Sequence, residues 1–348
     1  MKRTILGFVL AVSAVSAQQA GELYDPGPAV AFNSAGVTTS YKDDAGDTRT
    51  LELFVRRPAG VSGALPTVVW SHSAEVSGDV KTLMASWAEA TARAGYLTVV
   101  VSHPVRTMAD ALRQCDAIRA DEEACYRIRL VNWDWPRDLR AVLDFLEKQP
   151  EVDSKRIAVA GHQDGASAAV SLAGALRLLR SLDRKKADSF ADPRPVAFVS
   201  LSPQGPGLEG FADTDVFQDN HSWMNIKRPV FQATGAGDNT CHFGGSCRSG
   251  DTGTRRQIPF FLMPDGGKHL LFVNSVKISH ELIGSLNTEA CVAAGVEPAL
   301  CTSFADWLRT STIAFLDAYV KGRPAARAWL ASGALATVSK ELASIDSK

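Results

Sequence analysis

The chain reads Ile157-Ala158-Val159-Ala160-Gly161-His162-Gln163-Asp164-Gly165-Ala166 near its middle. An apolar run with β-branched residues ends at Gly161, and a run that favours helix begins just after Gly165. This pattern predicts a strand, a sharp turn and a helix, and the two glycines allow the helix to pack tightly against the strand. Such a turn usually presents a nucleophile at its apex, but the apex residue here is Gln163. An amide side chain cannot be deprotonated to attack a carbonyl group near neutral pH, so ordinary acyl-enzyme chemistry lacks its first group.

Further apolar runs flank this turn and alternate with helical patterns. We expect a hairpin of strands at 37–41 and 48–55, and a long closing helix at 304–320. The buried strands are expected at 66–72, 96–102, 157–161, 196–201, 229–234 and 258–263. This alternation predicts an α/β fold with a mostly parallel sheet and helices on both faces, whose ligands bind at the carboxyl ends of the strands.

Length and composition favour one large domain. The chain has 348 residues, of which 45% are hydrophobic and 22% charged. We expect an extended arm at 18–36 and a single α/β domain at 37–348, with a small lid-like insertion at about 104–132. The formal net charge of −1 gives no reason to expect nucleic acid or a membrane surface as a partner.

The first 17 residues have the pattern of an export signal. Lys2 and Arg3 precede an apolar run at 5–15, and Val15-Ser16-Ala17 provides a small-residue cleavage site. The apolar run is too short to span a bilayer. We therefore expect a periplasmic or secreted protein without a membrane span.

The six cysteines fall into three close pairs. Local pairing is the simplest arrangement, although six cysteines allow fifteen connectivities. The candidate disulfides are Cys115 with Cys125, Cys241 with Cys247, and Cys291 with Cys301. Disulfides in loops and insertions suit an exported protein. A zinc site is disfavoured because the short paired spacings of zinc ligands are missing, so no metal is expected.

Two residues after Gln163 are candidates for the acid and the base of a catalytic triad. Asp238 and then His269 each follow a predicted strand, in the chain order nucleophile, acid, histidine. In this interpretation Asp238 accepts the Nδ1 proton of His269 and leaves Nε2 as the base.

An oxyanion hole would use the backbone N–H groups of Ala74 and Asp164. We expect the Asp164 carboxylate to point outward as an acid in the first turn of a helix, where the helix dipole favours it. Asp164, Ser167 and Ser73 are alternative nucleophiles, each of them at a less suitable position than Gln163.

The motifs together resemble the bacterial dienelactone-hydrolase-like and platelet-activating-factor-acetylhydrolase-like esterases of the α/β-hydrolase fold. The resemblance covers about residues 35 to 330 and is carried by Val69-Trp70-Ser71-His72, Arg137-Asp138-Leu139, the turn at Gln163, Leu201-Ser202-Pro203-Gln204-Gly205-Pro206-Gly207, Gly267-Lys268-His269 and Asp317-Ala318-Tyr319-Val320-Lys321-Gly322. It implies hydrolysis of a small ester or related carboxyl compound without a metal or organic cofactor. The serine of that family falls on Gln163, and a glycine of its oxyanion loop falls on Ser73.

Three functional hypotheses follow. The first is a degenerate hydrolase that binds a small carboxyl compound without covalent catalysis. The second is a hydrolase or lyase in which the His269–Asp238 dyad acts on water or on the substrate, with Gln163 orienting the ligand. The third is an esterase with an unrecognised nucleophile.

Overall fold

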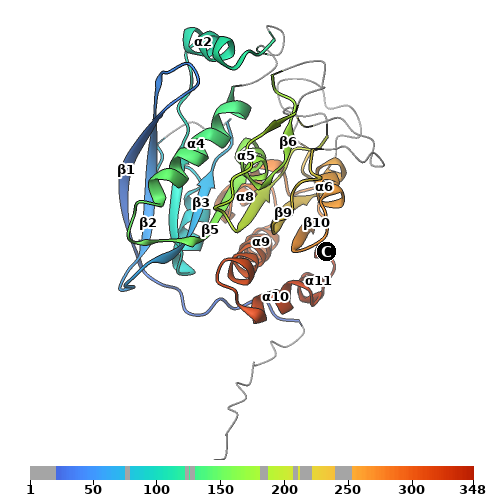
Figure 1. The fold of residues 1–348 in the computed structure, drawn as a ribbon. Helices are drawn as coiled ribbons and strands as arrows, with labels where there is room; N and C mark the ends of the chain where they lie inside the picture. Colours follow the sequence, from blue (N-terminus) through green and yellow to red (C-terminus); the bar gives the residue numbers. More distant parts are fainter. Residues whose placement is uncertain are drawn as a thin grey trace, which may run out of the picture.

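The computed structural model describes residues 21–74, 79–121, 125, 130–180, 187–206, 211, 222–239 and 253–348. Most of these residues build one mixed α/β arrangement around a nine-stranded sheet (Figure 1). The expected export signal at 1–17 and the expected pair Cys241–Cys247 lie outside the described residues. In the described ranges, no helix combines the length and apolar character needed to cross a bilayer.

The sheet has the strand order β1-β2-β4-β3-β5-β8-β9-β10-β11. Its six middle strands, β4 to β10 in that order, pair in parallel, and the remaining pairings are antiparallel. The strands are β1 (Phe32–Lys42), β2 (Thr48–Pro58), β3 (Leu65–Ser71), β4 (Leu97–Ser102), β5 (Val152–His162), β8 (Ala197–Leu201), β9 (Val230–Gly235), β10 (Lys268–Val273) and β11 (Ala343–Ser347). The expected α/β class with a mostly parallel sheet is confirmed.

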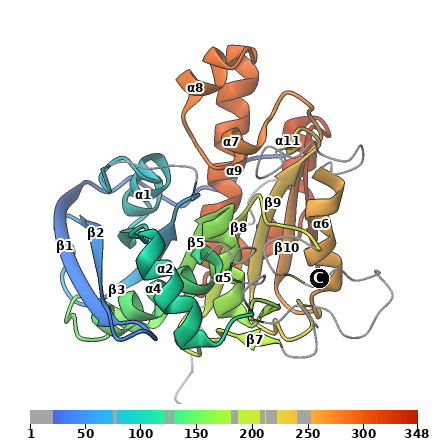
Figure 2. The same cartoon turned by 90° about the horizontal axis from the view of Figure 1, so that it is seen from above.

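Helices cover both faces of the sheet (Figures 1 and 2). One apolar core lies under α4 (Val131–Leu146) and α5 (Asp164–Ala173), and the other lies under α1 (Ala85–Arg93) and α9 (Pro298–Tyr319). Alternate residues of each central strand enter opposite cores, as Val69 and Trp70 do in β3. Burial on both faces explains why these strands are apolar at successive positions.

The remaining helices and strands lie outside the central sheet and its four main helices. They are α2 (Met108–Ile118), β6 (Leu176–Arg177), β7 (Asp188–Ser189), α6 (Gly253–Leu262), α7 (His280–Ile283), α8 (Thr288–Ala293), α10 (Pro324–Leu330) and α11 (Ala334–Ser339). The strands β6 and β7 form a separate two-stranded sheet.

The last parallel strand differs from the sequence-based prediction. Residues 258–262 of this run belong to the helix α6, which ends at Leu262, and the strand lies later in the chain, at β10. A short apolar run does not distinguish a buried strand from a buried helix by its periodicity. Pro259 within the run also lacks the N–H group that a central strand needs. This difference changes the position of the histidine expected to follow the strand.

The N-terminal arm is shorter than expected, because β1 begins at Phe32. The preceding residues pack along the C-terminal helices. The Tyr24 hydroxyl donates to Asp317 at 2.8 Å, and the Trp329 indole N–H donates to the carbonyl of Glu22 at 2.9 Å. Burial raises the pKa of Tyr24 to about 12, so its phenol remains a donor in this contact at neutral pH. The arm is thus fixed to the domain by specific hydrogen bonds.

Within the expected insertion at 104–132, the structure contains α2. Thr107 and Asp110 form a capping box at its start, and a disulfide joins Cys115 to Cys125. A second disulfide joins Cys291 to Cys301. These two pairings agree with the expected local connectivity and suit an oxidising compartment.

Candidate functional site

Gln163 lies at the apex of a strained turn between β5 and α5. Its backbone angles are φ 55° and ψ −112°, outside the regions that a residue with a side chain normally adopts. The Gln163 N–H donates to the carbonyl of Leu201 at 3.0 Å, and its carbonyl accepts from the N–H of Ser167 at 2.9 Å. The turn therefore keeps a strained conformation although its apex residue is not a nucleophile.

The two flanking glycines allow this geometry by close approach. A Cβ atom on Gly161 would lie 2.3 Å from the backbone of Gly165, and one on Gly165 would lie 2.2 Å from the carbonyl oxygen of Ser71. Neither distance can accommodate a methyl group. The sequence-based reason for glycine at both positions agrees with these contacts.

Asp238 orients a histidine, but that histidine is His280. The Nδ1 atom of His280 donates to Oδ1 of Asp238 at 2.7 Å, and both side chains are buried. This bond leaves Nε2 as the basic nitrogen of the neutral ring. The Asp238–His280 pair therefore has the geometry expected of an acid and a base.

The expected pairing of Asp238 with His269 is wrong. His269 lies within β10, where its Nδ1 atom bonds to the Ser347 hydroxyl at 2.7 Å and its Nε2 atom bonds to the Tyr319 hydroxyl at 2.9 Å. Its side chain thus links β10 to α9 and to the neighbouring strand β11. Had the last parallel strand been placed at β10, the next histidine along the chain would have been His280.

Arg256 on α6 completes the surroundings of Asp238 and was missed by the sequence reasoning. Its Nε atom lies 3.1 Å from Oδ1 of Asp238, and the Thr234 hydroxyl donates to Oδ2 at 2.7 Å. Burial raises the pKa of Asp238, but the hydrogen bond from His280 and the charge of Arg256 outweigh burial and lower it to about 2. Asp238 is therefore an anion at neutral pH.

The Asp164 side chain turns inward, contrary to the expected outward orientation. Its Oδ2 atom accepts the backbone N–H of Ala74 at 3.0 Å, and the residue is only 2% exposed. Its Oδ1 atom is buried and receives no hydrogen bond from the part of the chain that the structure describes. A carboxylate thus takes the N–H group that the oxyanion hole was expected to use. An anion at this position would oppose a second negative charge.

Ser73 and Ser167, the other two alternative nucleophiles, both lie near the turn but differ in their access to the site. The Ser73 hydroxyl donates to the side-chain carbonyl of Gln163. Ser167 lies inside α5, is buried, and does not line the cavity that Gln163 and Ser73 share. Of the two, Ser73 is the hydroxyl that lies in the site.

A cavity of about 470 Å³ brings these groups together. Gln163, His280 and Ser73 line it, along with residues at the start of α1 and in α7. Its volume falls within the range that small-molecule ligands occupy. His162 and His72 also line the cavity. Burial, followed by the neighbouring histidine, lowers the pKa of His162 to about 3 and that of His72 to about 4, so both rings are neutral near pH 7.

A serine–histidine–aspartate arrangement lies next to His72, outside the 470 Å³ cavity. The Ser71 hydroxyl bonds to Nε2 of His103 at 2.9 Å, and Nδ1 of His103 bonds to Asp138 at 2.9 Å. Asp138 also pairs with Arg49 and accepts from the Tyr41 hydroxyl. Ser71 is 0% exposed, so the arrangement offers a substrate no access to its hydroxyl. Its contacts instead fix the end of β3, next to His72.

No protein-family model matches this chain, and no curated protein matches it. Among the described residues, no group of three or more His, Cys, Asp or Glu side chains is arranged to hold a metal ion.

Proposed function

We propose that this chain is an exported protein of the α/β-hydrolase fold that binds a small ester or related carboxyl compound and does not catalyse the serine-esterase reaction. The observation that carries the proposal is the pairing of a strained turn with an amide at its apex. Gln163 supplies no nucleophile, although the two glycines and the Asp238–His280 pair remain in place. The sheet order and the resemblance to dienelactone-hydrolase-like esterases support the fold and the ligand class. Two disulfides support export.

Loss of the esterase reaction would involve two positions. Gln163 removes the attacking group, and the Asp164 carboxylate occupies the Ala74 N–H that would stabilise an oxyanion. Removing one oxyanion-hole donor costs roughly 100- to 1,000-fold in turnover. Restoring the hydroxyl group alone is therefore insufficient.

The test is hydrolysis of p-nitrophenyl acetate and butyrate by the purified mature protein and its variants. We expect no turnover by the parent and little by Gln163→Ser, because the Asp164 carboxylate still blocks the hole. The double variant Gln163→Ser/Asp164→Ala should exceed Gln163→Ser by at least ~100-fold.

A matched pair of histidine variants checks the assignment of the base. Adding His280→Ala to the double variant should abolish turnover, whereas adding His269→Gln should leave it. Turnover by the parent that survives Gln163→Ala would contradict the proposal.

A second candidate function is favoured by the intact Asp238–His280 pair. A purely binding protein has no need of an oriented base, and this pair could activate a water molecule or remove a substrate proton while Gln163 orients the ligand. In that case the parent would turn over a carboxyl substrate, His280→Ala would abolish the reaction, and Gln163→Ala would mainly raise KM.

A further inference from the structure

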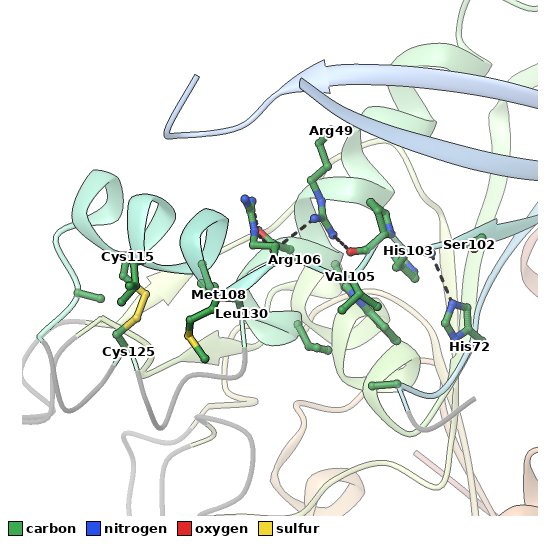
Figure 3. Close-up of a pocket in the computed structure, with 18 of the residues that line it drawn as sticks. Arg49, His72, Ser102, His103, Val105, Arg106, Met108, Cys115, Cys125 and Leu130 are labelled. Atoms are coloured by element: carbon green, nitrogen blue, oxygen red, sulfur yellow. Dashed lines mark hydrogen bonds and ion pairs between the residues drawn. A yellow bond between two sulfur atoms is a disulfide. The ribbon is translucent and has the colours of Figure 1, made fainter. Parts of the chain in front are cut away.

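A second and larger cavity lies beside the candidate site. It has a volume of about 780 Å³ and lies between α2, the start of α4 and the segment that follows β4 (Figure 3). His72 and Leu83 line both this cavity and the 470 Å³ cavity at Gln163. The two spaces are thus separated by shared side chains, and one ligand could extend from one to the other.

The wall formed by α2 is mainly apolar. Met108, Ala111 and Leu112 line the cavity at the spacing i, i+3, i+4, so they share one face of the helix. Leu130 and Val131 line it from the start of α4. Such a surface favours an apolar ligand, because its burial removes apolar area from water on both sides.

The edge of the cavity exposes large apolar side chains to solvent. Val105 is 94% exposed, Met108 71% and Leu112 50%, and all three line the cavity. Clustered exposed apolar groups commonly mark ligand-binding grooves. The disulfide between Cys115 and Cys125 also lines the cavity and fixes the far end of α2 (Figure 3).

The charged groups at the inner end are already compensated. Arg106 forms ion pairs with Asp43 and Asp134, and Arg49 pairs with Asp138 and lies 3.6 Å from Asp134. Two guanidinium groups therefore face three carboxylates, which leaves no positive charge for an anionic ligand. A carboxylate or phosphate head group would meet net negative charge here.

The polar end next to the candidate site consists of uncharged rings. His103 stacks on Trp135 with ring centroids 4.1 Å apart, and His72 lies 5.0 Å from the same indole. Burial lowers the pKa of both histidines, which keeps the rings neutral near pH 7. This end therefore suits a neutral polar group such as an ester.

We propose that the 780 Å³ cavity binds the apolar chain of a neutral ester, with the ester group directed past His72 toward Gln163. The proposal rests on the proposed function, because it names the ligand class of the same site. An apolar chain could belong to an ester or to a free fatty acid. The carboxylates around Arg49 and Arg106 favour the uncharged ester over the fatty-acid anion.

The experiment is a fluorescence titration of the mature protein with the neutral apolar probe N-phenyl-1-naphthylamine, followed by displacement at pH 7.5. Methyl decanoate should displace the probe more effectively than sodium decanoate, by at least tenfold in concentration. Each additional buried CH₂ group in a series of methyl esters should tighten binding by about fourfold.

Filling the cavity provides the structural control. Ala111→Trp and Ala120→Trp place an indole at positions that line the cavity, and each should weaken methyl decanoate binding by at least tenfold. Ala117→Trp adds the same group to an exposed position of α2 that does not line the cavity, and it should bind like the parent. Circular dichroism establishes that each variant is folded.

The proposal is overturned if esters fail to displace the probe, if decanoate binds as tightly as its methyl ester, or if Ala117→Trp weakens binding as much as Ala111→Trp. Because the titration measures binding without turnover, its outcome is separate from the esterase test. A parent that hydrolyses esters would contradict the proposed function but would leave the chain-binding cavity supported by a positive titration.

Discussion

At the scale of single residues, the backbone of Gln163 stores strain without a nucleophile to present. The combination of φ 55° and ψ −112° is costly for any residue with a Cβ atom and is accessible to glycine. The surrounding contacts impose it, since the Gln163 N–H and carbonyl are both bonded to neighbouring backbone groups. The strain is thus a property of the turn and is independent of which side chain the turn carries.

This strain predicts an unusual order of stability. Gln163→Gly and Gln163→Ala both delete the side chain, but only glycine relieves the backbone. We expect Gln163→Gly to be the more stable of the two by about 1–2 kcal/mol in urea denaturation. At Ser167, inside α5, the order should reverse, with glycine about 1 kcal/mol less stable than alanine. Equal stability of the two Gln163 variants would show that the turn is not strained in solution.

Asp164 illustrates what residue patterns do not reveal. Its place in the first turn of α5 follows from the sequence, and so does the favourable helix dipole. Its orientation depends on the Ala74 N–H, which comes from a loop 90 positions earlier in the chain. Such a contact is fixed by tertiary packing, so the outward orientation predicted from the local sequence was wrong.

At the scale of elements, buried charges join β1, β2, β4 and α4. Asp138 on α4 bonds to Arg49 on β2, to His103 after β4 and to Tyr41 on β1. Asp138 is 0% exposed and Arg49 is 6% exposed. Removing one partner of such a pair leaves a charge buried without compensation, which is more costly than removing both.

The corresponding test is a double-mutant cycle. Asp138→Leu should lower the free energy of unfolding by about 3–5 kcal/mol, because Arg49 is left buried without its main partner. Adding Arg49→Met should recover part of that loss. The exposed pair Glu89–Arg93 on α1 is the control, and Glu89→Gln should change stability by less than about 1 kcal/mol. A double variant less stable than Asp138→Leu would contradict this interpretation.

The element scale also explains which parts of the fold were predictable. The alternation of apolar strands with helices was sufficient to predict the α/β fold class. A strand that is buried on both faces has apolar residues at successive positions, and such a run is visible in the sequence. The same property made the run 258–263 ambiguous, and all of it except Met263 lies in α6. One misassigned element was enough to move the expected base from His280 to His269, whereas Asp238 follows a correctly predicted strand.

At the scale of the whole molecule, buried neutral histidines connect stability to pH. Burial lowers the pKa of His72 and His269 to about 4 and that of His162 to about 3, compared with about 6.5 in an unfolded chain. Between these values the unfolded state binds more protons than the folded state. Stability therefore falls as the pH decreases through this interval. Asp238 affects stability at lower pH, because its pKa is about 2 in the folded protein and about 3.9 in an unfolded chain. Its contribution to the free energy of unfolding is therefore complete above about pH 3.9 and is lost as the pH falls from there toward 2.

We accordingly expect the free energy of unfolding to decrease from pH 7 to pH 4.5, with each of the three histidines contributing at most about 1.4 kcal/mol per pH unit. His269 is the position at which to measure one contribution, because it lies in β10 and bonds only to neutral hydroxyl groups of Ser347 and Tyr319 among the hydrogen bonds in the described chain. When the free energy of unfolding from urea denaturation is plotted against pH, His269→Gln should reduce the slope of that plot by about 1 kcal/mol per pH unit below pH 6.5. Above pH 7.5, where the imidazole is neutral in both states, the curves of parent and variant should run parallel. Parallel curves throughout would mean that His269 titrates equally in the folded and unfolded chains, and that its burial in β10 carries no penalty for protonation.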